Sequence, residues 1–129
     1  MRFLSIYKNV ERNTPPSPEE MAAMGKLIEE GFKAGWLVGT EGCLPSALGA
    51  RARIDNGKIT VCDGPFTESK EVVGGFALLE APTKEAAIEL VRKFLEHTGQ
   101  GECELRQLYD ASSMDTCVGA EAEAVSLRK

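Results

Sequence analysis

The sequence predicts an α+β domain: a ferredoxin-like antiparallel sheet with two helices on one face and an inserted β-hairpin. Three observations support this prediction. Two amphipathic stretches with helical spacing lie far apart in the chain, and each has strand-like segments before and after it. Between them, an Asn-Gly turn joins two further strand-like segments. The chain has 129 residues, which fits one domain, since domains commonly contain roughly 100–150 residues.

The first strand and the first helix are indicated by composition and by capping residues. Residues 2–7 are rich in aromatic and β-favouring side chains, which is typical of a strand. Ser17, with Pro18 after it and Glu20 three positions on, predicts a helix that begins with a capping box. Apolar residues then recur at helical spacing as far as Gly35, a typical helix end.

The middle of the chain is expected to contain short strands separated by turns. We expect four strands in this part, at residues 36–39, 46–54, 58–62 and 72–80. Asn56-Gly57 tolerates the positive φ angles of a tight turn, so the second and third of these strands should form a hairpin. The Asp63-Gly64-Pro65-Phe66 segment is a second turn signal.

The second helix and the last strand complete the predicted domain. Thr83 can cap a helix that extends to about residue 97, and residues 102–109 alternate as a strand does. The domain is therefore expected to span residues 1–110. Residues 111–129 are expected to form a C-terminal tail with a short helix near 120–124.

The predicted helices cover only one face of the sheet. Apolar side chains such as Trp36 and Phe76 are expected on the other face, and no further part of the chain is predicted to cover them. A bare apolar face larger than a few hundred Å² is rare on a monomer. We therefore expect a homodimer in which two such sheets stack on each other.

The net charge of the chain restricts the classes of partner that it is expected to bind. Fifteen basic and twenty acidic residues give a net charge of −5, which disfavours direct binding to nucleic acid because such binders usually carry a basic face. No apolar run approaches the ~20 residues that cross a bilayer. The N-terminus also lacks the features of a signal peptide. We expect a cytoplasmic protein without a membrane partner.

The four cysteines predict neither a metal site nor a disulfide scaffold. They are at least ten residues apart, without a CxxC or CxH pair, at positions 43, 62, 103 and 117. We expect free thiols that are buried or half-buried, and we expect no cofactor. The single histidine, His97, falls at the end of the second predicted helix, where a solvated or dipole-stabilising role is expected.

Residues 59–76 read Ile-Thr-Val-Cys-Asp-Gly-Pro-Phe-Thr-Glu-Ser-Lys-Glu-Val-Val-Gly-Gly-Phe, and this stretch resembles the signature of YCII-related proteins of the DGPF type. Segments 16–21, 41–46 and 101–106 agree with it, so the resemblance covers about residues 1–110. It implies a dimeric α+β barrel but no particular reaction. Some wider relatives are small-molecule isomerases or lyases, and some members lie beside extracytoplasmic-function sigma factors. His97 matches no family motif.

The motif supplies the candidate catalytic residue. Asp63 and Glu68 could share a proton or hold a cation, with Lys70 as a counter-charge or an anion ligand. Asp63 is the candidate general acid or base. The alternative is that the motif is only a turn that orders the dimer, because Asp, Gly and Pro are common turn residues.

Further residues are candidates for lining a ligand cleft, each with simple packing or solvation as the alternative. Arg51 and Arg53 point to one face of a strand and could bind an anion. The complete candidate ligand-binding set is Tyr7, Arg51, Arg53, Phe66, Glu68, Lys70, Glu71 and Arg106.

Two functions from different classes fit these observations. One is a protein that binds a small molecule, or a modest acid/base enzyme of isomerase or lyase type, with a cleft near Asp63 in the homodimer. The other is a non-catalytic regulatory or protein-interaction module, linked to an extracytoplasmic-function sigma factor.

Overall fold

The computed structural model describes residues 1–12 and 14–110, which contain six strands, two α-helices and one short 3-10 helix. The tail expected at residues 111–129, with its short helix, lies outside the described residues. In chain order the elements are β1 (Arg2–Asn9), α1 (Pro18–Ala34), β2 (Leu37–Gly42), η1 (Ser46–Leu48), β3 (Ala50–Asp55), β4 (Lys58–Asp63), β5 (Val72–Glu80), α2 (Lys84–Thr98) and β6 (Glu102–Gln107).

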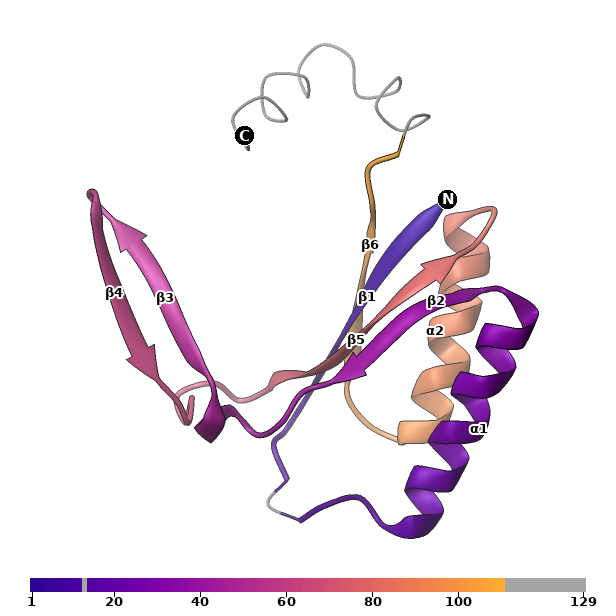
Figure 1. The fold of residues 1–129 in the computed structure, drawn as a ribbon, viewed down its shortest axis with the longest axis horizontal. Coiled ribbons are helices and arrows are strands. Elements are labelled where there is room, and N and C mark those ends of the chain that lie inside the picture. Colours follow the sequence, from indigo (N-terminus) through magenta and orange to yellow (C-terminus); the bar gives the residue numbers. More distant parts are fainter. Residues whose placement is uncertain (13, 111–129) are drawn as a thin grey trace.

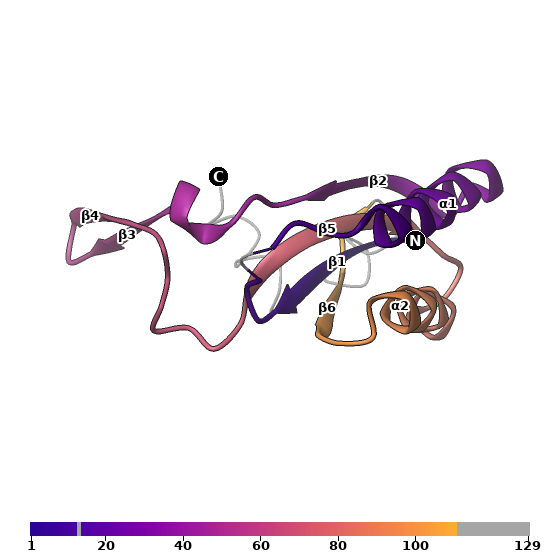
Figure 2. The ribbon, with the colours of Figure 1, turned by 90° about the horizontal axis from the view of Figure 1, so that it is seen from below.

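The strands form two separate sheets (Figure 1). Four of them make an antiparallel sheet in the order β2-β5-β1-β6, and β3 pairs only with β4. The predicted α+β fold with two helices and an inserted hairpin is therefore confirmed. The hairpin is an arm that projects from the end of the molecule opposite the helices (Figures 1 and 2). We call residues 50–63 the arm.

Both helices begin where the sequence predicts. The Ser17 hydroxyl accepts a hydrogen bond from the Glu20 backbone N–H at 3.1 Å, and the Glu20 carboxylate accepts one from the Ser17 N–H at 3.2 Å. This reciprocal pair is the predicted capping box. Thr83 caps α2 by accepting from the Ala86 N–H at 3.1 Å. Each helix ends at a glycine with positive φ, which satisfies the last carbonyls of the helix.

The core lies between the helices and one face of the four-stranded sheet. Phe3, Leu37 and Leu79 are neighbours across three strands and are all buried, together with Ala87 of α2. Trp36 packs against this cluster, and its ring lies close to the α1 backbone. The expectation that Trp36 lies on the uncovered face is therefore wrong, because it precedes β2 and turns toward α1.

The opposite face of the sheet is apolar at its centre, and no helix or strand of the described residues covers it. Alternation along β1 and β5 places four residues there, and none of them belongs to the core cluster. Phe76 is 38% exposed, in agreement with its predicted position. We call this surface the open sheet face; its central residues are Leu4, Ile6, Phe76 and Leu78.

Several predicted strand boundaries are wrong. The first strand extends to Asn9 instead of residue 7, and β2 extends to Gly42 instead of residue 39. Residues 46–48 form a 3-10 turn rather than the start of a strand, because Pro45 and Ser46 accept hydrogen bonds from the N–H groups three residues on. The last strand ends at Gln107 instead of residue 109. The final hydrogen bond between it and β1 is donated by the Leu108 N–H to the carbonyl of Arg2, the first residue of β1.

Candidate functional site

The segment that joins the arm to β5 carries most of the motif, and we call residues 64–71 the motif loop. Ser46, a buried residue of the 3-10 turn, anchors it: the Phe66 backbone N–H donates to the Ser46 hydroxyl at 3.2 Å. That hydroxyl donates in turn to the Glu11 carboxylate at 2.8 Å, which also accepts the Ser46 backbone N–H. Glu11 and Ser46 thus connect three loops at the base of the arm.

Gly64 is required by a close approach of two backbones. Its N–H donates to the Gly49 carbonyl at 2.9 Å, which continues the pairing of the arm toward its base. A Cβ at this position would lie 1.7 Å from the Ser46 carbonyl oxygen. No side chain fits there, so the glycine of the motif is explained by packing. The Gly64–Pro65 peptide bond is cis.

Arg51 holds the other side of the motif loop. Its guanidinium lies 3.9 Å from the centre of the Phe66 ring, a cation–π arrangement. It also forms an ion pair with Glu68 and donates to the Ser69 hydroxyl at 3.0 Å. The pKa of Glu68 is lowered, first by its own backbone N–H and then by Arg51. These contacts give Arg51, Phe66 and Glu68 a structural role in ordering the loop.

An apolar groove lies beside this cluster. Its volume is about 420 Å³. Phe66 lies between the groove and Arg51, because it lines the groove and its ring stacks on the Arg51 guanidinium. The lining residues come from the 3-10 turn, the motif loop and the start of β5: Cys43, Leu44, Pro45, Ser46, Leu48, Gly49, Ala50, Phe66, Val72 and Val73.

Asp63 lies at the end of β4, opposite Ala50, which lines the groove. Its carboxylate is exposed and has no hydrogen bond or ion pair within residues 1–12 and 14–110. Strand alternation places Asp63 on the arm face opposite to Arg51. Glu68 pairs with Arg51, so the two motif carboxylates are held on different sides of the arm.

The remaining arm and loop candidates are exposed. Arg53 shares a face with Arg51 and lies nearer the tip of the arm. Lys70 and Glu71 are exposed in the motif loop, and Glu71 contributes to the raised pKa of Lys8.

Tyr7 and Arg106 lie apart from the motif loop. The Tyr7 hydroxyl donates to the Gln100 carbonyl at 2.8 Å, and its ring meets Phe94 of α2 edge-on at 5.1 Å. Tyr7 therefore packs on the helix side of the sheet. Arg106 pairs with Leu4, whereas the start of β5 pairs with Asn9. Five residues of strand separate these positions, roughly 16 Å at ordinary strand rise.

β1 and β6 carry a row of charges, of which the sequence reasoning had named Arg106 but had missed Lys8 and Glu104. Lys8 Nζ lies 2.9 Å from Glu104 Oε1, and Arg106 lies 3.3 Å from the other carboxylate oxygen. Hydrogen bonds from both cations lower the pKa of Glu104, and the pKa of Lys8 is raised chiefly by Glu104. These residues border the open sheet face. The alternation of β6 was visible in the sequence, but its register against β1 was not.

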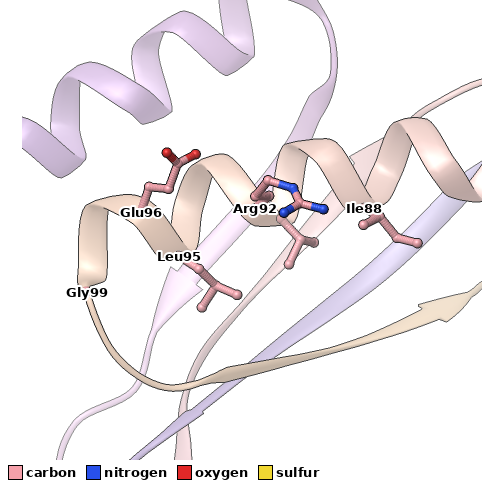
Figure 3. A pocket seen from close by; sticks show the side chains of 6 residues that line it. Ile88, Arg92, Leu95, Glu96 and Gly99 are labelled. Atoms are coloured by element: carbon pink, nitrogen blue, oxygen red, sulfur yellow. The ribbon is translucent and has the colours of Figure 1, made fainter.

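A second groove, of about 410 Å³, lies along α2 (Figure 3). None of the predicted site residues lines it, and its one cation, Arg92, also pairs with Glu89 at 3.5 Å. Its lining consists of Ile88, Val91, Arg92, Leu95, Glu96 and Gly99. The groove beside the motif loop is therefore the better candidate site.

The cysteines differ in part from expectation. Cys43, Cys62 and Cys103 are free thiols, but only Cys103 is half-buried, and burial raises its pKa. The expected burial of Cys43 and Cys62 is wrong, because the arm and its base have no layer packed over them. Cys117 lies outside the described residues.

The described residues contain neither a candidate metal site nor a candidate membrane-spanning helix. No group of three or more His, Cys, Asp or Glu side chains in the described residues is placed to hold a metal ion. No helix there has the length and apolar character needed to cross a bilayer. His97 is exposed in the last turn of α2.

The fold and the motif loop define a class of small α+β domains with an antiparallel sheet, two helices on one face and an inserted hairpin. Comparison with family models finds the YCII-related domain over residues 1–110. The chain belongs to the YCII-related family, as its motif predicted. No curated protein matches it.

Proposed function

We propose that this protein is a homodimer with a cleft near Asp63, in which it binds a small molecule or acts as a modest acid/base enzyme of isomerase or lyase type. The observation that carries the proposal is the exposed Asp63 carboxylate beside the apolar groove. Of the other two candidate carboxylates, Glu68 forms an ion pair with Arg51, and Glu71 is exposed in the motif loop before Val72.

The groove has the size and lining of a ligand site. Its volume of about 420 Å³ falls within the range of roughly 300–1,000 Å³ that is typical of small-molecule pockets. Such sites combine apolar walls with a few polar groups that orient the ligand. Here Phe66 and Leu48 would hold an apolar part of the ligand, and Asp63 at the rim would accept or donate a proton.

A second copy would turn the open groove into a closed cleft. The open sheet face carries apolar side chains that water contacts in a single chain, and stacking two copies would remove them from water. Closure would also exclude water from the Asp63 carboxylate, which strengthens its electrostatic interaction with a bound ligand.

The test is a thermal-shift screen against a broad panel of metabolites, read together with sedimentation mass. A compound at 100 times its dissociation constant should stabilise the wild-type protein by roughly 2.7 kcal/mol. Asp63→Asn should abolish that shift while it retains the fold. Asp55→Asn is the matched control, because Asp55 is an exposed arm carboxylate at the other end of β3.

Three results would count against the proposal. A sedimentation mass of one chain, 13.9 kDa, would exclude the homodimer. Equal loss of the shift in Asp55→Asn and Asp63→Asn would show that the effect is general charge. The absence of any stabilising compound, with Asp63→Asn unaltered in dimer mass, would favour the regulatory module instead.

A further inference from the structure

The arm has one apolar and one polar face, although no helix or strand of the described residues packs over it. Beyond Ala50 at its base, the register between β3 and β4 places four apolar side chains on the same side, and we call them the apolar arm face: Ala52, Ile54, Ile59 and Val61. The other side carries Arg51, Arg53, Asp55, Lys58, Thr60 and Cys62. This two-residue alternation is typical of a strand pair that covers an apolar surface with one side.

Within residues 1–12 and 14–110, no surface covers the apolar arm face. Ile54, Ile59 and Val61 are 67%, 66% and 66% exposed, values of side chains that project into solvent. The arm points away from the helices and from the core (Figures 1 and 2). An isolated two-stranded hairpin is at best marginally stable in water, so a long regular arm of this kind requires a covering surface.

We propose that each copy lays its apolar arm face on the open sheet face of the other copy. The inference rests on the proposed homodimer and specifies how its cleft is built. A two-fold axis makes the exchange reciprocal, so both uncovered apolar surfaces of both chains are buried in one closed assembly. The six-residue strands of the arm extend over roughly 20 Å, and β1 over roughly 27 Å, so the lengths match.

The surface area that the exchange would bury supports a second copy of this chain as the partner that covers the apolar arm face. An apolar side chain of this size removes roughly 60–120 Å² from water when it is covered. The four side chains of one arm then bury about 300 Å², and the surface beneath them buries a similar area. Two reciprocal contacts give about 1,200 Å², which reaches the range of specific protein interfaces.

The charges of the arm do not oppose this contact. Its three basic side chains, Arg51, Arg53 and Lys58, lie on the polar side of the arm and so point away from the surface that the apolar arm face would cover. Asp63 is the one charged residue of the arm that lies on the same side as the apolar arm face.

The exchange also completes the candidate site. Asp63 shares the apolar arm face, since it follows Val61 at the two-residue spacing of a strand. Asp63 of one copy would thus face the sheet of the other, where Lys8, Glu104 and Arg106 form their row of charges. The cleft would take its carboxylate from one chain and its cations from the other.

The experiment is a pair of charge variants, measured singly and mixed by sedimentation of the full chain. Ile59→Asp places a charge on the apolar arm face, and Phe76→Lys places one on the open sheet face. Thr60→Asp is the matched control, because it adds the same charge to the neighbouring residue on the polar side of the arm. We expect both single variants to sediment as monomers, the control as a dimer, and the equimolar mixture as a dimer.

The mixture separates arm exchange from other dimers. In an exchanged dimer the mixed pair has one wild-type contact and one Asp–Lys contact, so each variant rescues the other. If Ile59→Asp alone remains dimeric, the arm is not in the interface and the inference is wrong, while the proposed homodimer stands. Two monomeric variants that stay monomeric when mixed would also overturn it. A monomeric wild-type chain would overturn the proposed homodimer itself.

Folding of each variant is checked by circular dichroism and thermal unfolding. Ile54→Ser is the milder second variant on the same arm face, for use if Ile59→Asp does not fold. It should raise the dimer dissociation constant at least tenfold, because an apolar contact is lost twice in the symmetric assembly. An unchanged dissociation constant for Ile54→Ser would overturn arm exchange.

Discussion

Substitution of Gly64 by alanine tests the packing at the base of the arm most directly. An added Cβ would lie 1.7 Å from the Ser46 carbonyl oxygen and 2.6 Å from the Ser46 carbonyl carbon. Both atoms belong to the backbone, so no side-chain rotation relieves the clash. Either residue 64 or the 3-10 turn must move by more than 1 Å, on the order of the gap to an ordinary contact.

The loss of unfolding free energy in Gly64→Ala follows from the contacts that this movement breaks. Overpacking of a well-packed site costs about 1–3 kcal/mol. Separation of the two segments also stretches the Gly64 N–H bond to Gly49 and the Phe66 N–H bond to the Ser46 hydroxyl. Each such bond contributes about 0.5–1.5 kcal/mol. The free energy of unfolding should therefore fall by about 2–6 kcal/mol, a large part of the total of roughly 5–15 kcal/mol for a domain.

Thermal and urea unfolding measure this change. A loss of about 1 kcal/mol lowers the melting temperature of a domain of this size by roughly 4 °C, so we expect a decrease of about 8–24 °C. Gly42→Ala is the control, since a Cβ there meets nothing within 4 Å. A decrease for Gly64→Ala of less than about 2 °C relative to the control would refute the close approach of the two backbones.

Three further substitutions test the helices and the sheet. Ser17→Ala removes the capping box and should cost about 1 kcal/mol in urea unfolding, whereas an unchanged midpoint would refute the cap. Gly25→Ala should instead stabilise by up to about 1 kcal/mol, because a Cβ at this helical position meets nothing within 4 Å; a lower melting temperature would contradict that. Glu104→Gln tests how the free energy of unfolding depends on pH. The lowered pKa of Glu104 stabilises the wild-type fold above its ordinary value of 4.5, and this stability is lost as the pH falls through the folded-state pKa. Between pH 6 and pH 3 the variant should therefore lose less unfolding free energy than the wild type, and parallel curves would exclude the contribution.

The sequence predicted the elements with local signals most accurately. Ser17 and Glu20 fix the start of α1 through hydrogen bonds between residues three apart, so the pattern is complete within one turn. The Asn56-Gly57 turn likewise defines the arm, and Asn56 has the positive φ that the pair predicts. These features depend on neighbours in the chain, which a sequence displays directly.

The contacts that the sequence did not reveal join distant segments. Glu11 and Ser46 are 35 positions apart, and no sequence pattern indicates that they contact each other, although Ser46 belongs to the 41–46 segment that resembles the family. Residues 46–48 were predicted as the start of a strand, because the composition Ser-Ala-Leu does not distinguish a strand from a 3-10 turn. Tyr7 was expected to line a cleft, yet β1 directs its odd-numbered residues toward the helices. Which face of a strand is covered depends on where the helices pack, and no local pattern encodes that.

The candidate site depends both on local sequence signals and on contacts between segments that are distant in the chain. The motif marks residues that hold the base of the arm: Gly64 permits the close approach, and Phe66 packs against Arg51, which also binds Glu68. Asp63 lies on the apolar side of the arm, opposite Ala50, which lines the groove. Part of the charge in the motif is thereby explained, because Glu68 pairs with Arg51 and orders the loop, whereas Asp63 is exposed without a hydrogen bond or ion pair in the described residues. This difference is why Asp63, and not Glu68, is the carboxylate that we propose acts on a ligand.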